Sequence, residues 1–291
     1  MTGIWHASTP VCAARPNPGA SAGRLTDAQR EVSSGKDGKL VAVPVTIGAI
    51  GAVWNDTAVK KSGLKRPTTW PEVLRFCRAA KDKGVVAFAL GLKDAWVDQL
   101  VPYALTASLV YGPDPDVTQQ QLDGKAGFAT SRWKEAMDKY LDMRDAGCFN
   151  KSPSGTGYEE QMQLLGKGKT LGAVHVLSAV ASAKQYATSD TTFSMTPFPA
   201  TDNAGDTRLP VAVGISYAVN ARARQPQLAR EFIRFLASEE GQNIYATKAA
   251  AAPALPNASF KADSLHRTDN ALTEQRLSSA VVALAESAVH P

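Results

Sequence analysis

Apolar and polar positions follow two different spacings along the chain, one typical of strands and the other of helices. The segment KLVAVPVTIGAIGAVWN, residues 39–55, mixes small and β-branched residues, which predicts an extended chain. Pro44 inside it favours an edge or crossover position, because proline cannot donate to a strand ladder. Shorter segments with strand character lie at residues 85–90, 171–177, 192–199, 209–213 and 215–219.

Helical spacing of apolar residues predicts helices between these strands. Pro71 and Pro226 each mark a helix start, since a first-turn proline loses no hydrogen bond there, and Gly84 marks a helix end. Thr69 and Ser238 are predicted to be helix caps. The predicted helices cover residues 70–83, 97–110, 131–146, 158–165, 226–236 and 239–245.

Apolar stripes on two of these helices predict which side chains pack in the core. In the helix that follows Pro226, the stripe consists of Leu228, Phe232, Phe235 and Leu236. In the helix that precedes Gly147, it consists of Trp133, Met137, Tyr140 and Leu141.

Composition bounds the class of protein. The chain has 291 residues, 44% of them hydrophobic and 20% charged, which suits one large or two medium globular domains. No apolar run approaches the roughly 18 residues that cross a bilayer. The net charge is +5, but Lys and Arg are scattered. The densest basic segment, Lys60–Arg66, lacks interleaved aromatics, so a solvated surface is predicted and no nucleic-acid partner.

The three cysteines, Cys12, Cys77 and Cys148, are odd in number and far apart, without metal-ligand spacing. A buried thiol is therefore expected at Cys77, which lies on a helical pattern, and no disulfide is required. The polar run Asp202–Asp206 resembles a calcium loop only in part, and a hairpin turn is predicted there.

Catalytic motifs are absent from the sequence. It contains no HExxH, GxSxG, Walker A or GxGxxG pattern, so the usual parts of zinc hydrolysis, nucleophile-elbow chemistry and nucleotide binding are missing. Of the four histidines, only His175 lies within a predicted strand. We therefore expect a protein that is not an enzyme, with no cofactor and no metal. A small α/β enzyme using His175 as a base is the catalytic alternative.

Several ordered motifs resemble one family. GKLVAVP is similar to an extended crossover that leads to an aromatic–Asn pair, here Trp54–Asn55. GLKRPTTWPEV resembles the helix start that follows it, and the segment from Gly214 to Tyr245, with its SEEGQ, resembles the closing helices. These motifs resemble the extracytoplasmic solute-binding proteins of carbohydrate ABC transporters, the maltose-binding-protein-like family 1.

The resemblance implies an α/β fold of the periplasmic binding protein type II kind. The second lobe would be largely complete, whereas most of the first lobe has no counterpart. The predicted divisions are a loose arm (1–38), a crossover with a first-lobe remnant (39–45), the second lobe (46–210), a return crossover with first-lobe helices (211–258) and a partly helical tail (259–291).

Sugar binding needs aromatic faces and a few polar groups. The resemblance implies a cleft-facing aromatic at Trp96, with Asp94 and Lys93 beside it, and small residues at Gly214 and Ser216 where the backbone approaches ligand. The family often has a tryptophan near VHVLSAV, where this chain has His175 and Ser178. Two alternatives stay open: Trp96 packs at a helix start, and His175 is a hydrogen-bonded core histidine.

The resemblance implies a substrate-binding component of an ABC importer. It would bind a sugar or oligosaccharide between two lobes, deliver it to permease transmembrane subunits, and act as an extracytoplasmic monomer. The N-terminus shows no signal-peptide pattern and no lipid anchor. The alternative to a working binding protein is a fragment that keeps the fold and binds nothing.

Overall fold

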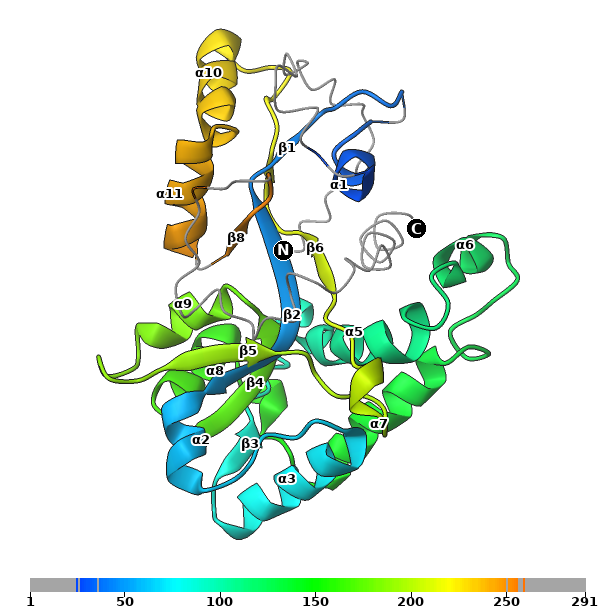
Figure 1. Cartoon of the computed structure of the whole chain (residues 1–291), viewed down its shortest axis with the longest axis vertical. Coiled ribbons are helices and arrows are strands. Elements are labelled where there is room, and N and C mark those ends of the chain that lie inside the picture. The colour runs from blue at the N-terminus through cyan, green and yellow to red at the C-terminus, as the bar shows by residue number, and fades with distance from the viewer. Residues whose placement is uncertain (1–24, 26, 36, 250, 256–258, 260–291) are drawn as a thin grey trace. The chain divides into compact units, whose positions relative to one another are not determined.

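The computed structural model describes residues 25–259 except 26, 36, 250 and 256–258, and these residues form two compact units (Figure 1). The first unit contains the described residues up to Ile47, together with Val213–Lys248 and those from Ala252 onward. The second unit is built on Gly48–Ala212. The predicted tail lies outside the described residues except for Ser259, and so does most of the predicted arm.

One long strand organises the sheet. β2 (Thr46–Asn55) is antiparallel to β4 (Thr170–Val176) on one side and to β5 (Phe193–Thr196) on the other. β3 (Val86–Phe88) extends the sheet, parallel to β4. The strand order is therefore β3-β4-β2-β5, and two further short strands also pair with β2: β6 (Val211–Val213) and β8 (Ala252–Pro253).

The helices of the second unit cover both faces of this sheet (Figure 1). Their bounds are α2 (Asp56–Ser62), α3 (Trp70–Asp82), α4 (Ala95–Asp98), α5 (Leu100–Thr106), α6 (Val117–Leu122), α7 (Trp133–Asp145), α8 (Tyr158–Gly166) and α9 (Ala179–Lys184). A π-helical turn, Ala107–Tyr111, continues α5. Gly84 and Gly147, which follow α3 and α7, both have positive φ, a conformation that glycine adopts without steric cost.

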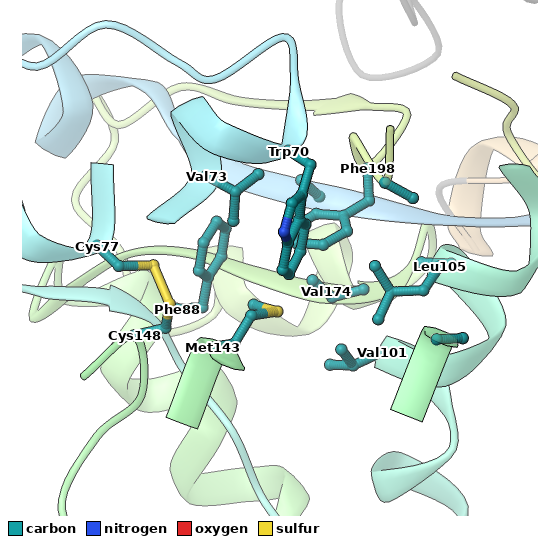
Figure 2. Packing of buried hydrophobic residues seen from close by; sticks show 14 of the residues in the cluster. Trp70, Val73, Cys77, Phe88, Val101, Leu105, Met143, Cys148, Val174 and Phe198 are labelled. Carbon is teal, nitrogen blue, oxygen red and sulfur yellow. A yellow bond between two sulfur atoms is a disulfide. The ribbon is translucent and has the colours of Figure 1, made fainter. Parts of the chain in front are cut away.

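Alternation along β2 sends its side chains into two cores. Ala52 and Trp54 pack with α3, α5 and α7 in the larger core, part of which is drawn in Figure 2. Ala49 and Val53 face the smaller core under α8 and α9. The sheet is thus buried on both faces, as the apolar composition of its strands predicts.

The pair Trp54–Asn55 supports the fold. The Trp54 indole lies in the larger core, and its Nε1 donates to Thr196 Oγ1 at 2.8 Å. Asn55 Oδ1 accepts from the Ala58 amide at 2.9 Å and caps α2, while its Nδ2 donates to the Leu165 carbonyl at 2.9 Å. One amide side chain therefore joins the start of α2 to the end of α8.

The prediction of a buried free thiol at Cys77 is wrong. Cys77 on α3 and Cys148 after α7 form a disulfide within the larger core, with a Cα–Cα distance of 4.7 Å (Figure 2). The two cysteines are 71 residues apart in sequence, so their spacing gives no local signal of the pairing. Packing of α3 beside α7 brings them together.

The first unit contains a two-stranded sheet and three helices among its described residues. β1 (Val43–Pro44) is antiparallel to β7 (Ser216–Tyr217). Its helices are α1 (Asp27–Val32), α10 (Pro226–Leu236) and α11 (Glu239–Ala249). Ser238 caps α11 as predicted, because its Oγ accepts from the Gly241 amide at 3.1 Å. Helix α1 lies within the segment predicted to be a loose arm, so that part of the prediction is wrong.

Three local predictions about side chains are wrong. Thr69 precedes α3, but its side chain makes no capping bond; Glu72 instead accepts from the Thr68 amide and hydroxyl, both at 2.8 Å. On α7, Met137 and Leu141 are exposed although Trp133 is buried. On α10, Ile233 and Leu236 are buried, whereas the rest of the predicted stripe is exposed.

Loss of the disulfide should lower the stability of the second unit. A closed loop of this length removes enough entropy from the unfolded chain to stabilise the fold by about 4 kcal/mol. We expect Cys77→Ser/Cys148→Ser to unfold at a clearly lower temperature than the parent, measured by circular dichroism. Cys12→Ser is the matched control and should leave the midpoint unchanged. Equal midpoints for the parent and the double variant would contradict the role given to the disulfide.

Candidate functional site

Two loops of the second unit lock together where β3 ends. The Leu92 amide donates to the Pro153 carbonyl at 2.9 Å, and the Lys93 amide donates to the Thr156 carbonyl at 3.1 Å. A Cβ atom on Gly91 would stand 3.2 Å from the carbonyl oxygens of Thr156 and Gly157, closer than most side chains tolerate. Glycine at position 91 therefore permits the close approach of the two backbones.

Asp94 fixes the start of α8. Its Oδ2 accepts from the Tyr158 amide at 2.6 Å, and Tyr158 is the first residue of that helix. The amides of the first helical turn have no partner within the helix, and a carboxylate there also interacts favourably with the helix dipole. Asp94 precedes α4 in sequence but makes no capping bond to it. The carboxylate therefore orients α8 from a different segment of the chain.

Three rings meet beside this carboxylate. The centroids of Trp96 and Tyr158 are 5.1 Å apart, and His175 lies 5.3 Å from each. The Trp96 side chain is 46% exposed, although the His175 ring that contacts it is fully buried. The Tyr158 hydroxyl donates to Ser182 Oγ at 2.8 Å, which fixes the orientation of its ring. The result is a partly exposed indole supported by two ordered rings.

His175 is held as a neutral side chain. The Val176 amide donates to its Nδ1 at 2.9 Å, so the ring proton is on Nε2. Nε2 has no hydrogen-bond partner among the described residues. Burial lowers the pKa of His175 from 6.5 to about 4. The imidazole, whose ring contacts Trp96, therefore has an unused donor.

The remaining predicted residues of the second unit are exposed. The Lys93 side chain is exposed on the loop just before α4, the helix that carries Trp96. Ser178 is exposed just after β4, at the start of α9. The structure thus brings Trp96 and His175 into contact, and it places Asp94 against Tyr158.

Gly214 and Ser216 belong to the first unit. The Gly214 amide donates to the Thr46 carbonyl at 2.8 Å, and Ser216 pairs with Pro44 in the small sheet. Both residues are exposed. Their approach to a ligand bound at Trp96 stays a prediction.

Tyr158 is the residue that sequence reasoning missed. The sequence predicts it only as the start of a helix, yet its ring contacts both Trp96 and His175. The available signal is an aromatic residue directly after GTG, at a helix start. That signal says nothing of the partner, since Asp94 is 64 residues away.

Other kinds of site are not indicated. Within the described ranges, no group of three or more His, Cys, Asp or Glu side chains is arranged to hold a metal ion. The segment around Asp202 forms a 3-10 turn, Ala204–Asp206, in which Asn203 accepts from the Gly205 amide. No described helix is both long and apolar enough to span a membrane.

Solved structures of other proteins have the same fold. A chitin oligosaccharide binding protein superposes with a TM-score of 0.75 at 19% identity, covering 91% of this chain and 67% of that one. The raffinose complex of the solute-binding protein RafE superposes with a TM-score of 0.70 at 18% identity, covering 87% and 66%. The predicted α/β fold of the periplasmic binding protein type II kind is thereby confirmed.

The family follows from the sequence itself. The family model described as bacterial extracellular solute-binding protein matches residues 17–243, more than half of the chain. This chain belongs to that family.

Two curated relatives have sugar-binding names. A probable sugar-binding periplasmic protein of Rhizobium meliloti (strain 1021) is 33% identical over 110 residues, which are 37% of this chain and 26% of that protein. A multiple sugar-binding protein of Streptococcus mutans is 22% identical over 210 residues, or 71% and 49% of the two chains. The chain thus spans half or less of the length of these relatives.

The bond from Asp94 to Tyr158 should contribute measurably to stability. Asp94→Ala removes the acceptor for a helix-start amide and should lower the free energy of unfolding by about 1–2 kcal/mol in urea titrations. Asp94→Asn keeps an acceptor of the same shape, so its free energy of unfolding should fall by less. Equal losses in the two variants would contradict a capping role.

The buried imidazole should make stability depend on pH. The unfolded histidine takes up a proton as the pH falls below 6.5, whereas the folded one remains neutral down to about pH 4. Stability present above pH 6.5 is therefore lost as pH falls towards 4, by about 3 kcal/mol from this residue. Urea unfolding of the parent and of His175→Gln at several pH values measures the difference. A difference that stays constant from pH 7 to 4 would contradict the assignment.

Proposed function

We propose that this chain is a substrate-binding component of an ABC importer that binds a sugar or an oligosaccharide. The observation that carries the proposal is the half-exposed Trp96 indole, held by Tyr158 and His175 in the second unit. An indole face matches the apolar C–H surface of a sugar ring, and ordered supporting rings reduce the entropy lost on binding. The sugar-binding names of the relatives support the same class of ligand.

Polar groups around the indole would take the hydroxyl groups of the ligand. Lys93 and Ser178 are exposed and can donate, while Asp94 has a second carboxylate oxygen beyond the one that accepts from Tyr158. His175 is fully buried, so its role would be to support the Trp96 and Tyr158 rings that it contacts.

The first unit would complete the site through Gly214 and Ser216 when the protein closes on its ligand. The hinge would lie in the two crossover segments, residues 43–46 and 211–216. These segments are hydrogen-bonded side by side: the Val45 amide donates to the Ile215 carbonyl at 2.8 Å. Hinge residues lie in loops or at the ends of elements, where φ and ψ can change, and these segments contain the ends of β1, β2, β6 and β7.

The partners and the location follow from this role. The ligand would be delivered to the transmembrane subunits of a permease by a monomer outside the cytoplasm, with no nucleic-acid partner. The Cys77–Cys148 disulfide supports an extracytoplasmic location, since such bonds persist in oxidising compartments.

The catalytic alternative has little support from the site. A buried imidazole with a pKa of about 4 is a poor base near neutral pH. We therefore propose a protein that is not an enzyme. The remaining alternative is a chain that folds but binds no sugar, and a binding measurement separates the two.

Isothermal titration calorimetry with raffinose, stachyose, a chitin oligosaccharide and galactose tests the proposal. We expect at least one sugar to bind, and Trp96→Ala to weaken that binding by about tenfold or more. Phe128→Ala is the matched control, because Phe128 is also an exposed aromatic side chain of the second unit. It should leave the affinity unchanged.

Thermal unfolding of the same samples distinguishes the possible failures. A ligand at 100 times its dissociation constant adds about 2.7 kcal/mol to stability. A cooperative transition that no sugar moves would rule out sugar binding over this panel and leave the fold intact. Equal weakening by Trp96→Ala and Phe128→Ala would reject the indole as the binding surface.

A further inference from the structure

A cavity of about 740 Å³ lies in the second unit, where three helices end. Lys61 is in the last turn of α2, Lys83 follows α3 and Lys167 follows α8, and all three line the cavity, which we call the lysine cavity. Lys61 also belongs to Lys60–Arg66, the densest basic segment of the sequence. No Asp or Glu is among the described residues that line this cavity. Its lining charges are therefore all positive.

A second cavity of the same unit has a different charge distribution. It has a volume of about 630 Å³ and is formed by α3 and by the end of α7. Its charged lining residues have both signs: Arg78, Lys81, Asp82, Asp142 and Asp145. Opposite charges offset each other's field, whereas a cleft lined by one sign of charge concentrates counter-ions. Of these two cavities, the lysine cavity is therefore the one suited to an anion.

The three lysines of this cavity form no ion pair within the part of the chain that the structure describes. Acidic residues near them in sequence have other partners. Asp56 pairs with Arg66, Asp82 lines the second cavity, and a hydrogen bond from Thr188 lowers the pKa of Asp190. One lysine at a helix C-terminus is already favourable, because it complements the helix dipole. Three such ends around one cavity leave positive charge available to a ligand.

Hydroxyl groups and an ordered wall complete the cavity. Thr57 Oγ1 accepts from the Thr192 amide at 3.1 Å, and the Thr192 hydroxyl lies 3.5 Å away, at the outer limit of a hydrogen bond. The Thr57 proton can therefore be donated to a ligand. Buried Asn55 joins the start of α2 to the end of α8 through two bonds of 2.9 Å. The wall is thus held in place, which reduces the entropy lost on binding.

We propose that the lysine cavity binds a compact polyanion that carries phosphate or carboxylate groups. Its three ammonium groups match two or three negative charges, and charge-assisted hydrogen bonds to lysine suit both kinds of oxyanion. The volume lies within the roughly 300–1,000 Å³ of small-molecule sites. The cavity is lined by residues of the second unit and by none of Trp96, Tyr158 and His175. Anion binding there is therefore separate from sugar binding at the indole.

Isothermal titration calorimetry of the full chain with pyrophosphate and with citrate tests the proposal. We expect at least one of the two anions to bind, and Lys61→Gln/Lys83→Gln/Lys167→Gln to weaken that binding by about tenfold or more. Binding of pyrophosphate alone would assign phosphate as the ligand group, and binding of citrate alone would assign carboxylate. No binding of either anion at millimolar concentration would overturn the proposal.

Lys125→Gln/Lys134→Gln/Lys151→Gln is the matched control for net charge. It removes the same number of charges from exposed positions of the second unit that do not line the cavity. The affinity of this variant should stay within about twofold of the parent, because distant exposed charges are screened by salt. Circular dichroism shows whether both triple variants fold. Equal weakening of anion binding by the two triple variants would overturn the proposal.

Lysine acetylation locates the bound anion. At ten times its dissociation constant, the anion leaves only about one molecule in eleven free. Lys61, Lys83 and Lys167 should then react with an acetylating reagent about tenfold more slowly than in the anion-free protein, as measured by mass spectrometry of peptides. Lys125 and Lys151 are internal controls whose rates should not change. Equal slowing of all five lysines, or of none, would overturn the proposal.

Discussion

The backbone ladder of β2 is the constraint on which the second unit depends. Because β2 lies between β4 and β5, both edges of its C-terminal half are hydrogen-bonded, and its side chains fill a core on each face of the sheet. Its last residue, Asn55, caps α2 and holds the end of α8. The same helix α8 begins at Tyr158, beside Trp96. The geometry of the candidate site therefore depends on how this central strand is paired.

Signals that act within a few residues predicted much of the fold. Pro71 and Pro226 start helices because their fixed φ suits a first turn, and Gly84 ends α3 because it adopts a positive φ. Properties that depend on distant segments were not predictable in this way. The pairing of Cys77 with Cys148 needs α3 to lie against α7, a contact that no local pattern encodes.

The candidate site likewise contains residues that local sequence signals predict and residues that they do not. Trp96 was predicted by resemblance to a family, and an indole in the segment after a predicted strand is visible in the sequence. Tyr158 was not predicted, because its partners Trp96 and Asp94 lie far from it in sequence, Asp94 by 64 residues. His175 was recognised as the one histidine within a strand, but its complete burial depends on rings from two other segments.

The close approach at Gly91 has a consequence for how ligand preference changes in evolution. Backbone hydrogen bonds and glycine contacts fix the two interlocked loops, so their shape depends little on the side chains they expose. Lys93 can then be exchanged for another residue while the loop backbone around it stays in place. The backbone shape of the site and its ligand preference can therefore change independently, and a single substitution can alter the preference without altering the backbone.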